Sequence, residues 1–188
     1  MAKITFNPNV AHVHGHVGNW VLKERMGVDI VAAKPDQVHQ PNSPAQQQQR
    51  AKFQQAAVYA KGSMTDAQLK ALYSAKAKLE KSSPFAEAVK DWFTPPVVDA
   101  ILLSDYHKHP GEPISIRAHD DFEVVGVNVE LKNASTNAVL ESGPAGYDAP
   151  SGQWVYAATT DASSVAQVMV TATALDHPGH PGTLSATA

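Results

Sequence analysis

The stretch VVGVNVELK at residues 124–132 reads as a short β-strand, and six comparable pieces share the chain from Val97 onward. Turn-rich breaks, such as GPAGYDAPSG at 143–152 and DHPGHPG at 176–182, separate the pieces. Short strands with regular turn signals between them predict a β-sandwich. The other six pieces are VVDAILL (97–103), PISIRAH (113–119), AVLES (138–142), QWVYAATT (153–160), AQVMVTATA (166–174) and TLSATA (183–188).

The composition points toward contacts with other proteins. Of the 188 residues, 43% are hydrophobic and 18% are charged, and the formal net charge is −3. A soluble domain usually has about 25% charged residues, so this surface is comparatively easy to desolvate. The negative balance and the scattered lysines give no electrostatic reason to expect nucleic acid as a partner.

The chain contains no cysteine, which excludes disulfides, cysteine-ligated zinc, iron–sulfur clusters and thiol catalysis. The opening MAKITFNPNVAHVHGHVG lacks an apolar core after a basic start, so we expect no classical secretory signal. No stretch approaches the roughly 18 consecutive apolar residues of a membrane helix, so no membrane span is predicted.

The first part of the chain is expected to be extended, with a β-hairpin. Residues 1–40 read as extended, and Ile4 and Phe6 alternate with polar neighbours. The pieces NWVLKER at 19–25 and VDIVAAK at 28–34 flank Met26-Gly27, which is a plausible centre for a tight turn.

A first helix is predicted after a linker at residues 36–44. Ser43 stands at the N-cap, a proline follows it, and Gln46 lies three residues after the cap, which together make a capping box. We expect this helix to run to about Lys61, with Gly62 ending it. Its apolar face would consist of Phe53, Ala56, Ala57 and Ala60.

Two further helices complete this part. Thr65 repeats the capping device, and Ser83-Pro84 begins a short third helix that Thr94-Pro95-Pro96 stops. We therefore place a domain boundary there, with an arm, hairpin and helical domain at 1–95 and a β-sandwich at 96–188. The predicted fold class is α+β.

Several motifs of the second half resemble those of bacterial immunoglobulin-like domains from surface and adhesive proteins. They are HDDFEVVGVNVELKN (119–133), SGQWVYAATT (151–160) and VMVTATALDHPGHPG (168–182). The resemblance covers about half the chain. It implies an immunoglobulin-like sandwich that works outside the cell, in which Trp154 is a core tryptophan rather than a platform for stacking a ligand.

The first half has a more distant resemblance. Residues 14–93 are similar to a module of uncharacterised bacterial proteins that consists of a hairpin followed by helices, and no activity comes with it. The matching residues are Gly15, Val17, Gly18, Asn19, Gln46, Arg50, Phe53, Leu69 and Tyr73.

Three alternating histidines form one candidate metal site. On a strand, His12, His14 and His16 would share a face with about 7 Å between neighbours, a spacing at which histidines can ligate zinc. The alternative, which we favour, is that they line a polar sheet face or a contact between subunits. No aspartate or glutamate nearby in sequence supplies a fourth ligand, and no supporting second shell can be located.

A second candidate lies at one end of the predicted sandwich. There the loop after the second strand would bring Asp120 and Asp121 near Asp176, with His119, His177 and His180 beside them. Converging carboxylates could hold Ca²⁺. The alternative, which we favour, is that these aspartates cap turns through their own backbone. No cofactor is therefore firmly predicted.

No catalytic residue set stands out. Ser104, Asp105 and His107 are too close in sequence to form a triad, and the chain has no nucleophile elbow, Walker motif or Rossmann glycine pattern. We expect a protein that is not an enzyme. A metal-dependent enzyme built on His12, His14 and His16 is the hypothesis we favour least.

The architecture favours a structural subunit that assembles with itself. The N-terminal arm offers little local means of burying Ile4, Phe6 and Val10, and a sandwich has open edges. Such an arm can add a strand to a neighbouring copy, with the three histidines in the same interface. Repeated head to tail, this contact makes an open filament, as in an extracellular appendage or a virion. The alternative is an adhesin-like module that binds a glycan or host surface through Tyr106, Phe122 or Tyr147.

Overall fold

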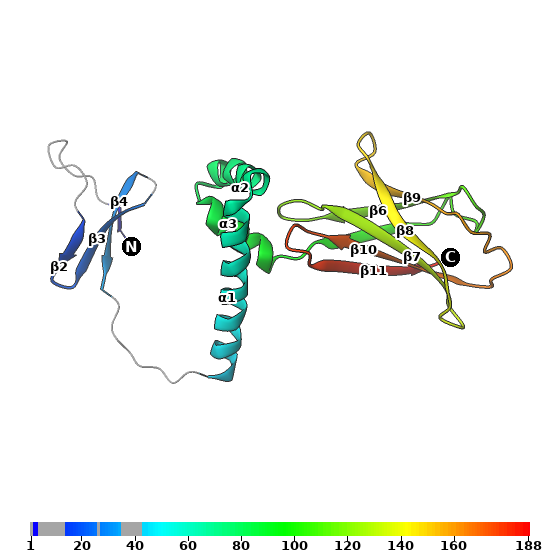
Figure 1. Ribbon diagram of the computed structural model, residues 1–188, viewed down its shortest axis with the longest axis horizontal. Coiled ribbons are helices and arrows are strands. Elements are labelled where there is room, and N and C mark those ends of the chain that lie inside the picture. Colours follow the sequence, from blue (N-terminus) through cyan, green and yellow to red (C-terminus); the bar gives the residue numbers. More distant parts are fainter. Residues whose placement is uncertain (1, 4–13, 26, 35–42) are drawn as a thin grey trace. The chain divides into compact units, whose positions relative to one another are not determined.

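The computed structural model of the chain describes residues 2–3, 14–25, 27–34 and 43–188 (Figure 1). These residues form three helices and two antiparallel β-sheets, which is an α+β fold. The chain divides into two compact units, one made of Met1–Gln55 and Ser63–Glu87 and the other of Ala56–Gly62 and Ala88–Ala188. The predicted domain boundary between residues 95 and 96 stays a prediction.

The N-terminal unit contains a four-stranded sheet in the order β1-β4-β3-β2. The strands are β1 (Ala2–Lys3), β2 (Gly15–Val17), β3 (Trp20–Arg25) and β4 (Val28–Ala33). The predicted hairpin is confirmed, because β3 and β4 pair from Trp20↔Ala33 to Arg25↔Val28. Gly27 lies in the turn with φ 72°, a backbone conformation that glycine adopts without strain.

Both described ends of the expected arm belong to this sheet. Ala2 pairs with Val31 of β4, and Gly15 pairs with Leu22 of β3. Ile4, Phe6, Val10 and His12, on which the arm hypothesis mainly rests, lie outside the described residues.

The helices are α1 (Pro44–Thr65), α2 (Ala67–Glu80) and α3 (Pro84–Phe93). The predicted capping box of α1 is confirmed. The backbone N–H of Gln46 donates to Ser43 Oγ at 3.3 Å, and that of Ser43 donates to Gln46 Oε1 at 3.1 Å. Ser43 thus sets the start of the helix through bonds that involve only its immediate neighbours.

The predicted end of the first helix is wrong. Helix α1 continues past Gly62 to Thr65, and Asp66 rather than Thr65 caps α2. Asp66 Oδ1 accepts hydrogen bonds from the N–H of Gln68 at 2.8 Å and of Leu69 at 2.9 Å. A glycine inside a helix costs only about 1 kcal/mol, so the helix continues until the next cap begins.

The predicted apolar face of α1 is only partly confirmed. Ala56 and Ala60 are fully buried, but Phe53 is 53% exposed. No residue of α1 before Ala56 is buried. The first turns of this helix are therefore uncovered on every side.

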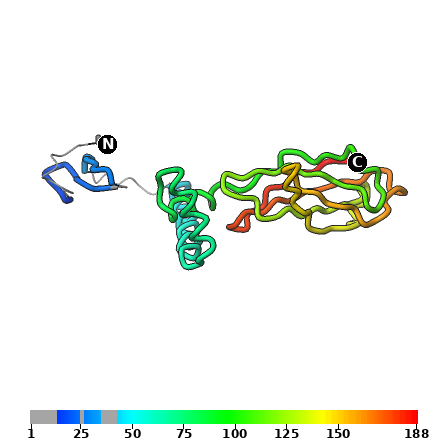
Figure 2. The backbone as a smooth tube through the Cα atoms, turned by 90° about the horizontal axis from the view of Figure 1, so that it is seen from above, coloured from blue at the N-terminus to red at the C-terminus, as the bar shows by residue number. Residues whose placement is uncertain are grey.

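The C-terminal unit contains a seven-stranded antiparallel sheet in the order β11-β10-β7-β8-β9-β6-β5. The end strands β5 and β11 lie against each other, so the outer margins of this sheet face one another rather than standing open. Figure 2 shows the strands running side by side along the length of the unit. They are β5 (Val97–Leu102), β6 (Pro113–His119), β7 (Gly126–Asn133), β8 (Val139–Asp148), β9 (Gln153–Ala157), β10 (Val168–Leu175) and β11 (Pro181–Thr187).

All seven predicted strands are present, but the predicted break at residues 143–152 is wrong in its first half. Strand β8 continues to Asp148, pairing with β7 as far as Ala145 and with β9 from Gly146 onward. Gly143 lies against a ring, since a Cβ there would be 3.0 Å from Tyr156 Cε2. Pairing with two successive partners outweighs the local turn preference of glycine and proline.

The core of this unit is formed by alternate residues along its strands. Along β10, Val168, Val170, Ala172 and Ala174 are fully buried and the residues between them are half-buried. Neighbouring strands turn matching apolar positions inward, as expected for sheets with one covered face. Other fully or almost fully buried residues are Ile114, Ile116, Val127, Val129 and Leu131.

Gly182 of β11 permits the close approach to the start of β5. A Cβ at this position would lie 1.8 Å from the carbonyl oxygen of Pro96, so the strands would have to separate. We expect Gly182→Ala to lower the free energy of unfolding by about 1–3 kcal/mol. Urea denaturation followed by circular dichroism measures this change.

Gly126→Ala in β7 is the matched control, because a Cβ there meets nothing within 4 Å. We expect its free energy of unfolding to stay within about 1 kcal/mol of the wild-type value. Equal stability of the two variants would show that the contact at Pro96 does not constrain the strands.

Candidate functional site

Two loops meet at one end of the C-terminal unit, as the sequence predicts. The loop between β6 and β7 contacts the turn between β10 and β11. His177 Nε2 lies 3.1 Å from Glu123 Oε2, and the His177 and Phe122 rings pack edge to face with centroids 5.6 Å apart. The predicted meeting of the two loops that contain Asp120, Asp121 and Asp176 is therefore confirmed.

Turn capping explains much of this arrangement. Asp120 Oδ2 accepts hydrogen bonds from the N–H of Phe122 at 3.3 Å and of Glu123 at 3.1 Å. Asp176 Oδ1 accepts one from the N–H of His180 at 2.5 Å. The prediction that Asp120 and Asp176 cap their own turns is confirmed.

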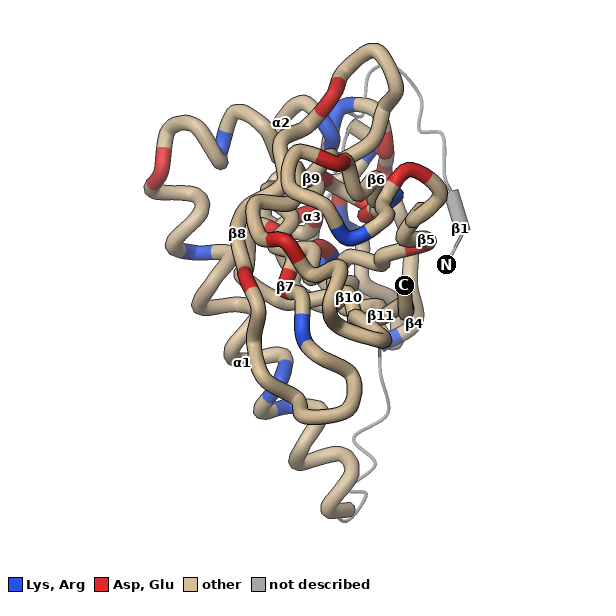
Figure 3. Tube along the Cα trace, turned by 90° about the vertical axis from the view of Figure 1, so that its right-hand side faces the viewer, with Lys and Arg blue, Asp and Glu red and all other residues tan. Residues whose placement is uncertain are grey.

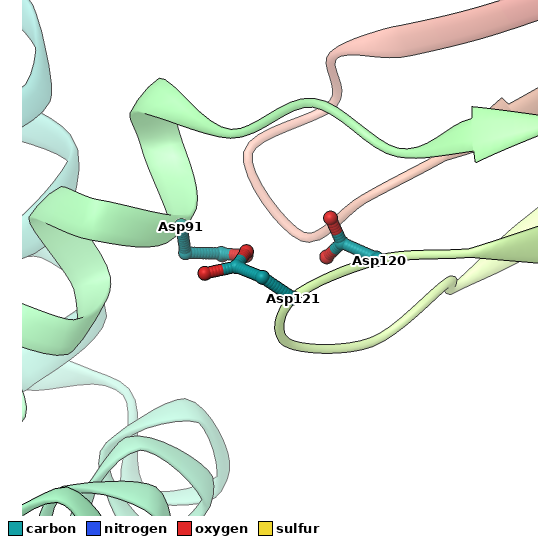
Figure 4. A group of neighbouring side chains, drawn as sticks. All are labelled: Asp91, Asp120 and Asp121. Carbon is teal, nitrogen blue, oxygen red and sulfur yellow. The ribbon is translucent and has the colours of Figure 1, made fainter.

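A third carboxylate joins this end from α3. Ligand atoms of Asp91, Asp120 and Asp121 all lie within 4.8 Å of one another, and Figure 4 shows Asp91 reaching from the helix toward the loop. Asp91 is only 1% exposed. Sequence reasoning missed it, although it falls three residues after the buried Ala88 and thus on the inner face of α3.

The charges at this end are only partly balanced. Lys90 Nζ lies 3.2 Å from Asp121 Oδ2, so one carboxylate of the cluster has a cationic partner. Asp176 is 4% exposed, and its burial raises its pKa, with a further rise from the charge of Asp120. The N–H and ring of His180 act in the opposite direction, with Nδ1 3.5 Å from Asp176 Oδ2.

The cluster of Asp91, Asp120 and Asp121 has the chemistry of a hard-cation site. Carboxylate oxygens are preferred Ca²⁺ ligands, and three carboxylates could supply part of the six to eight oxygens that Ca²⁺ takes. Asp176, which the sequence suggests as a ligand, is not one of the three. The same side chains also have structural partners, namely the turn N–H groups and Lys90.

The histidine candidate is not assembled among the described residues. His14 Nε2 lies 3.9 Å from Glu24 Oε2, so a carboxylate does approach it, and both His14 and His16 are exposed. No metal-ligating set among the described residues includes either histidine. His12 lies outside them.

A groove of about 530 Å³ opens beside the carboxylate cluster, with Asp120 in its lining. Tyr147 of β8 and Trp154 of β9 are paired across the strands, and their rings lie 5.2 Å apart along one wall. Tyr147 is 59% exposed, whereas Trp154 is half-buried and also packs against the core. Polar side chains of the lining are those of His119, Asp120 and Glu123.

Of the three aromatic residues predicted as ligand contacts, Phe122 and Tyr147 line the groove. The prediction for Tyr106 is wrong, because this residue is only 4% exposed. Its burial, with the nearby charges of Glu141 and Glu112, raises its pKa to about 12. Trp154 packs against the core, as predicted, and its ring also lies along the groove wall.

Comparison with family models, with curated proteins and with solved structures finds no match. Among the described residues, no helix is long and apolar enough to cross a membrane.

The raised pKa of Asp176 predicts a pH-dependent cost to stability. Its ordinary value is near 3.8, so between that value and the raised one the folded state holds the proton more tightly than the unfolded state. Ionisation of Asp176 therefore lowers the stability of wild type relative to Asp176→Asn as pH rises through this window, because the asparagine keeps the acceptor for His180 N–H and does not titrate. Urea denaturation from pH 4 to pH 7 should show the variant gaining on wild type.

Asp161→Asn is the control of opposite sign. Hydrogen bonds from Ser163 lower the pKa of Asp161, so its ionised form stabilises the fold as pH rises. The lowered pKa puts this change below pH 3.8, so that variant should fall behind wild type as pH rises toward 3.8, and its difference from wild type should then stay nearly constant from pH 4 to pH 7. A parallel pH dependence for both variants would contradict the environment assigned to Asp176.

Proposed function

We propose that this chain is a structural subunit of an extracellular filament, appendage or virion that assembles through exchange of its N-terminal strand. The observation that carries the proposal is the uncovered state of the N-terminal sheet. Among residues 14–24 and 27–34 none is buried. Val17 is 63% exposed and Trp20 is 56% exposed. A sheet is stable when one face packs against another layer, so a second copy is a natural cover.

The strand pairing suits exchange between copies. Within the part of the chain that the structure describes, strand β1 joins the sheet through two residue pairs, Ala2↔Val31 and Lys3↔Ile30. The same main-chain hydrogen bonds form whether β1 and β4 belong to one chain or to two. The acceptor in this proposal is β4 of the N-terminal sheet. The C-terminal sheet is a poor acceptor because its end strands lie against each other.

The strand order of the C-terminal unit supports the finer proposal of an immunoglobulin-like sandwich. The order β5-β6-β9-β8 corresponds to strands A-B-E-D of that fold, and β7-β10-β11 corresponds to C-F-G. In the immunoglobulin fold the buried tryptophan lies on strand C. Trp154 lies instead on β9, which corresponds to strand E. Such domains commonly form repeated extracellular structures, which is an argument by analogy of fold.

The groove beside Tyr147 favours a second candidate function, the binding of a glycan. Sugar rings present apolar C–H faces and many hydroxyl groups. The Tyr147 and Trp154 rings could contact such a face, while Asp120 and Glu123 could accept hydrogen bonds from hydroxyl groups. A subunit on an external surface could carry both functions.

The strand-exchange proposal predicts which chains share the β1–β4 pair. The wild type contains no cysteine, so engineered thiols react only with each other. Directly opposed residues of antiparallel strands have Cα atoms about 4.5–5.5 Å apart, which suits a disulfide. We expect a mixture of the single variants A2C and V31C, oxidised together, to give a disulfide-linked dimer. Electrophoresis without reductant measures it, and electron micrographs should show extended particles that deletion of residues 1–10 abolishes.

The control mixture pairs A2C with V139C, because Val139 is exposed but lies on β8. It should give no dimer above background. If the double variant A2C/V31C formed only an internal disulfide, and the mixture of single variants gave no dimer, strand exchange would be ruled out.

The glycan proposal predicts a ligand whose binding depends on Tyr147. We expect screening on a glycan array to identify a bound saccharide, and Tyr147→Ala to weaken that binding by about fivefold or more, since one aromatic contact contributes about 1 kcal/mol. Titration calorimetry with the identified saccharide measures the change. Val139→Ala, at an exposed position outside the groove, should bind like wild type. Equal affinities of both variants would exclude the groove.

A further inference from the structure

Positive and negative charges are separated along this chain. Residues 43–83 contain seven basic residues (lysine or arginine) and two acidic ones. Residues 97–188 contain three basic residues and eleven acidic ones. The first segment therefore has a formal charge of +5 and the second one of −8, although the whole chain has only −3. A separation of this size creates fields that steer association.

The cationic segment, residues 43–83, presents its charges to solvent. Six of its seven basic side chains are exposed and Lys76 is half-buried. On α1, Gln46, Gln49, Arg50 and Phe53 recur at helical spacing and, with Gln54, line an uncovered groove of about 550 Å³. This face combines an exposed ring with a cation and lacks any acidic residue.

The acidic segment, residues 97–188, has few cations of its own to balance it. Lys108 Nζ donates to the backbone carbonyls of Val165 and Ala166 at 3.2 and 2.8 Å. Lys132 Nζ lies 2.6 Å from Glu130 Oε1, and Arg117 is the third basic residue of a segment that contains eleven acidic ones. Figure 3 shows acidic positions distributed over the strands and loops, whereas basic positions recur along α1.

We propose that the cationic segment of one copy binds the acidic segment of the next copy. The inference rests on the self-assembly proposed above and adds a second contact to strand exchange. The contact joins two different surfaces, so it is heterologous and repeats from subunit to subunit without closing on itself unless the rotation forms a ring.

Charge complementarity favours a second copy over the other anionic partners. Every copy brings an acidic surface of −8, so this partner is present at the same concentration as the cationic segment. A nucleic acid or an anionic membrane would be repelled by the acidic segment of the same chain. The groove on α1 is also lined mainly by glutamine, and Phe53 is the one apolar side chain of that lining, which gives little area for insertion into lipid.

Salt provides the first test of this contact. The screening length falls from about 10 Å at 0.1 M salt to about 3 Å at 1 M, so an attraction between exposed charges weakens strongly. We expect sedimentation velocity of the full chain to show association whose dissociation constant rises at least about tenfold over that range. The effect must depend on protein concentration. A salt effect that is the same at every concentration would reflect attraction within one chain and would overturn the proposal.

Two complementary variants test the polarity of the contact. The first carries Lys52→Glu, Lys61→Glu and Lys70→Glu, all at exposed positions of α1 and α2. The second carries Asp99→Lys, Asp105→Lys and Asp148→Lys, at exposed or half-buried positions of the acidic segment. Each variant alone should lose most of the salt-sensitive association, because the cationic segment falls to −1 in the first variant and the acidic segment to −2 in the second. A mixture should recover it and stop at one-to-one pairs, because only one of the two possible contacts remains attractive. Circular dichroism of both variants checks that they are folded.

The outcomes separate this inference from the strand-exchange proposal. Salt-sensitive association that survives in both variants, with the A2C–V31C disulfide still formed, would overturn the charge contact alone. Loss of that disulfide would overturn strand exchange instead. If the cationic segment bound a single-stranded oligonucleotide or vesicles of anionic lipid in place of a second copy, with no one-to-one pair in the mixture, the assignment of the partner would be wrong.

Discussion

The alternation of inward and outward side chains along β10 is the constraint on which the C-terminal unit depends. Its four inward residues are completely removed from solvent, and β10 is hydrogen-bonded on both sides, to β7 and to β11. A shift of one residue in either pairing would turn this apolar set outward, so the register of three strands is fixed together. The loop end with Asp120 and Asp176, which joins these strands to their neighbours, is held in place by that register.

The parts of the fold that the sequence predicts are those decided by near neighbours. Ser43 caps α1 through Gln46, and Gly27 turns the hairpin, each through bonds within a few residues. The wrong predictions concern places where contacts with distant segments determine the structure. Strand β8 continues through Gly143 and Pro144 because it pairs with β7 and then with β9 along successive stretches. The turn preference of these two residues is local and contains no information about those distant strands.

The candidate site likewise contains some residues whose position the sequence predicts and others whose position it does not. The predicted strand order implied that the β6–β7 loop meets the β10–β11 turn, so Asp120 and Asp176 could be placed at one end in advance. Asp91 could not be placed there, because its contribution depends on where α3 docks. The groove wall formed by Tyr147 and Trp154 likewise needs the register of β8 with β9, which the predicted turn at this point obscured. The segregation of charge, by contrast, is visible in the sequence once counts are made by segment.

The two-sided pairing of β8 has a consequence for how the C-terminal unit acquires its structure. Strands β7, β8 and β9 follow one another in the chain and pair as a meander, so their contacts close short loops at small entropic cost. The pairs β6–β9 and β7–β10 span far longer stretches of chain. This order of costs favours a folding nucleus centred on β8, onto which the β5–β6 and β10–β11 hairpins dock later, and a rate in the range of domains dominated by non-local pairing.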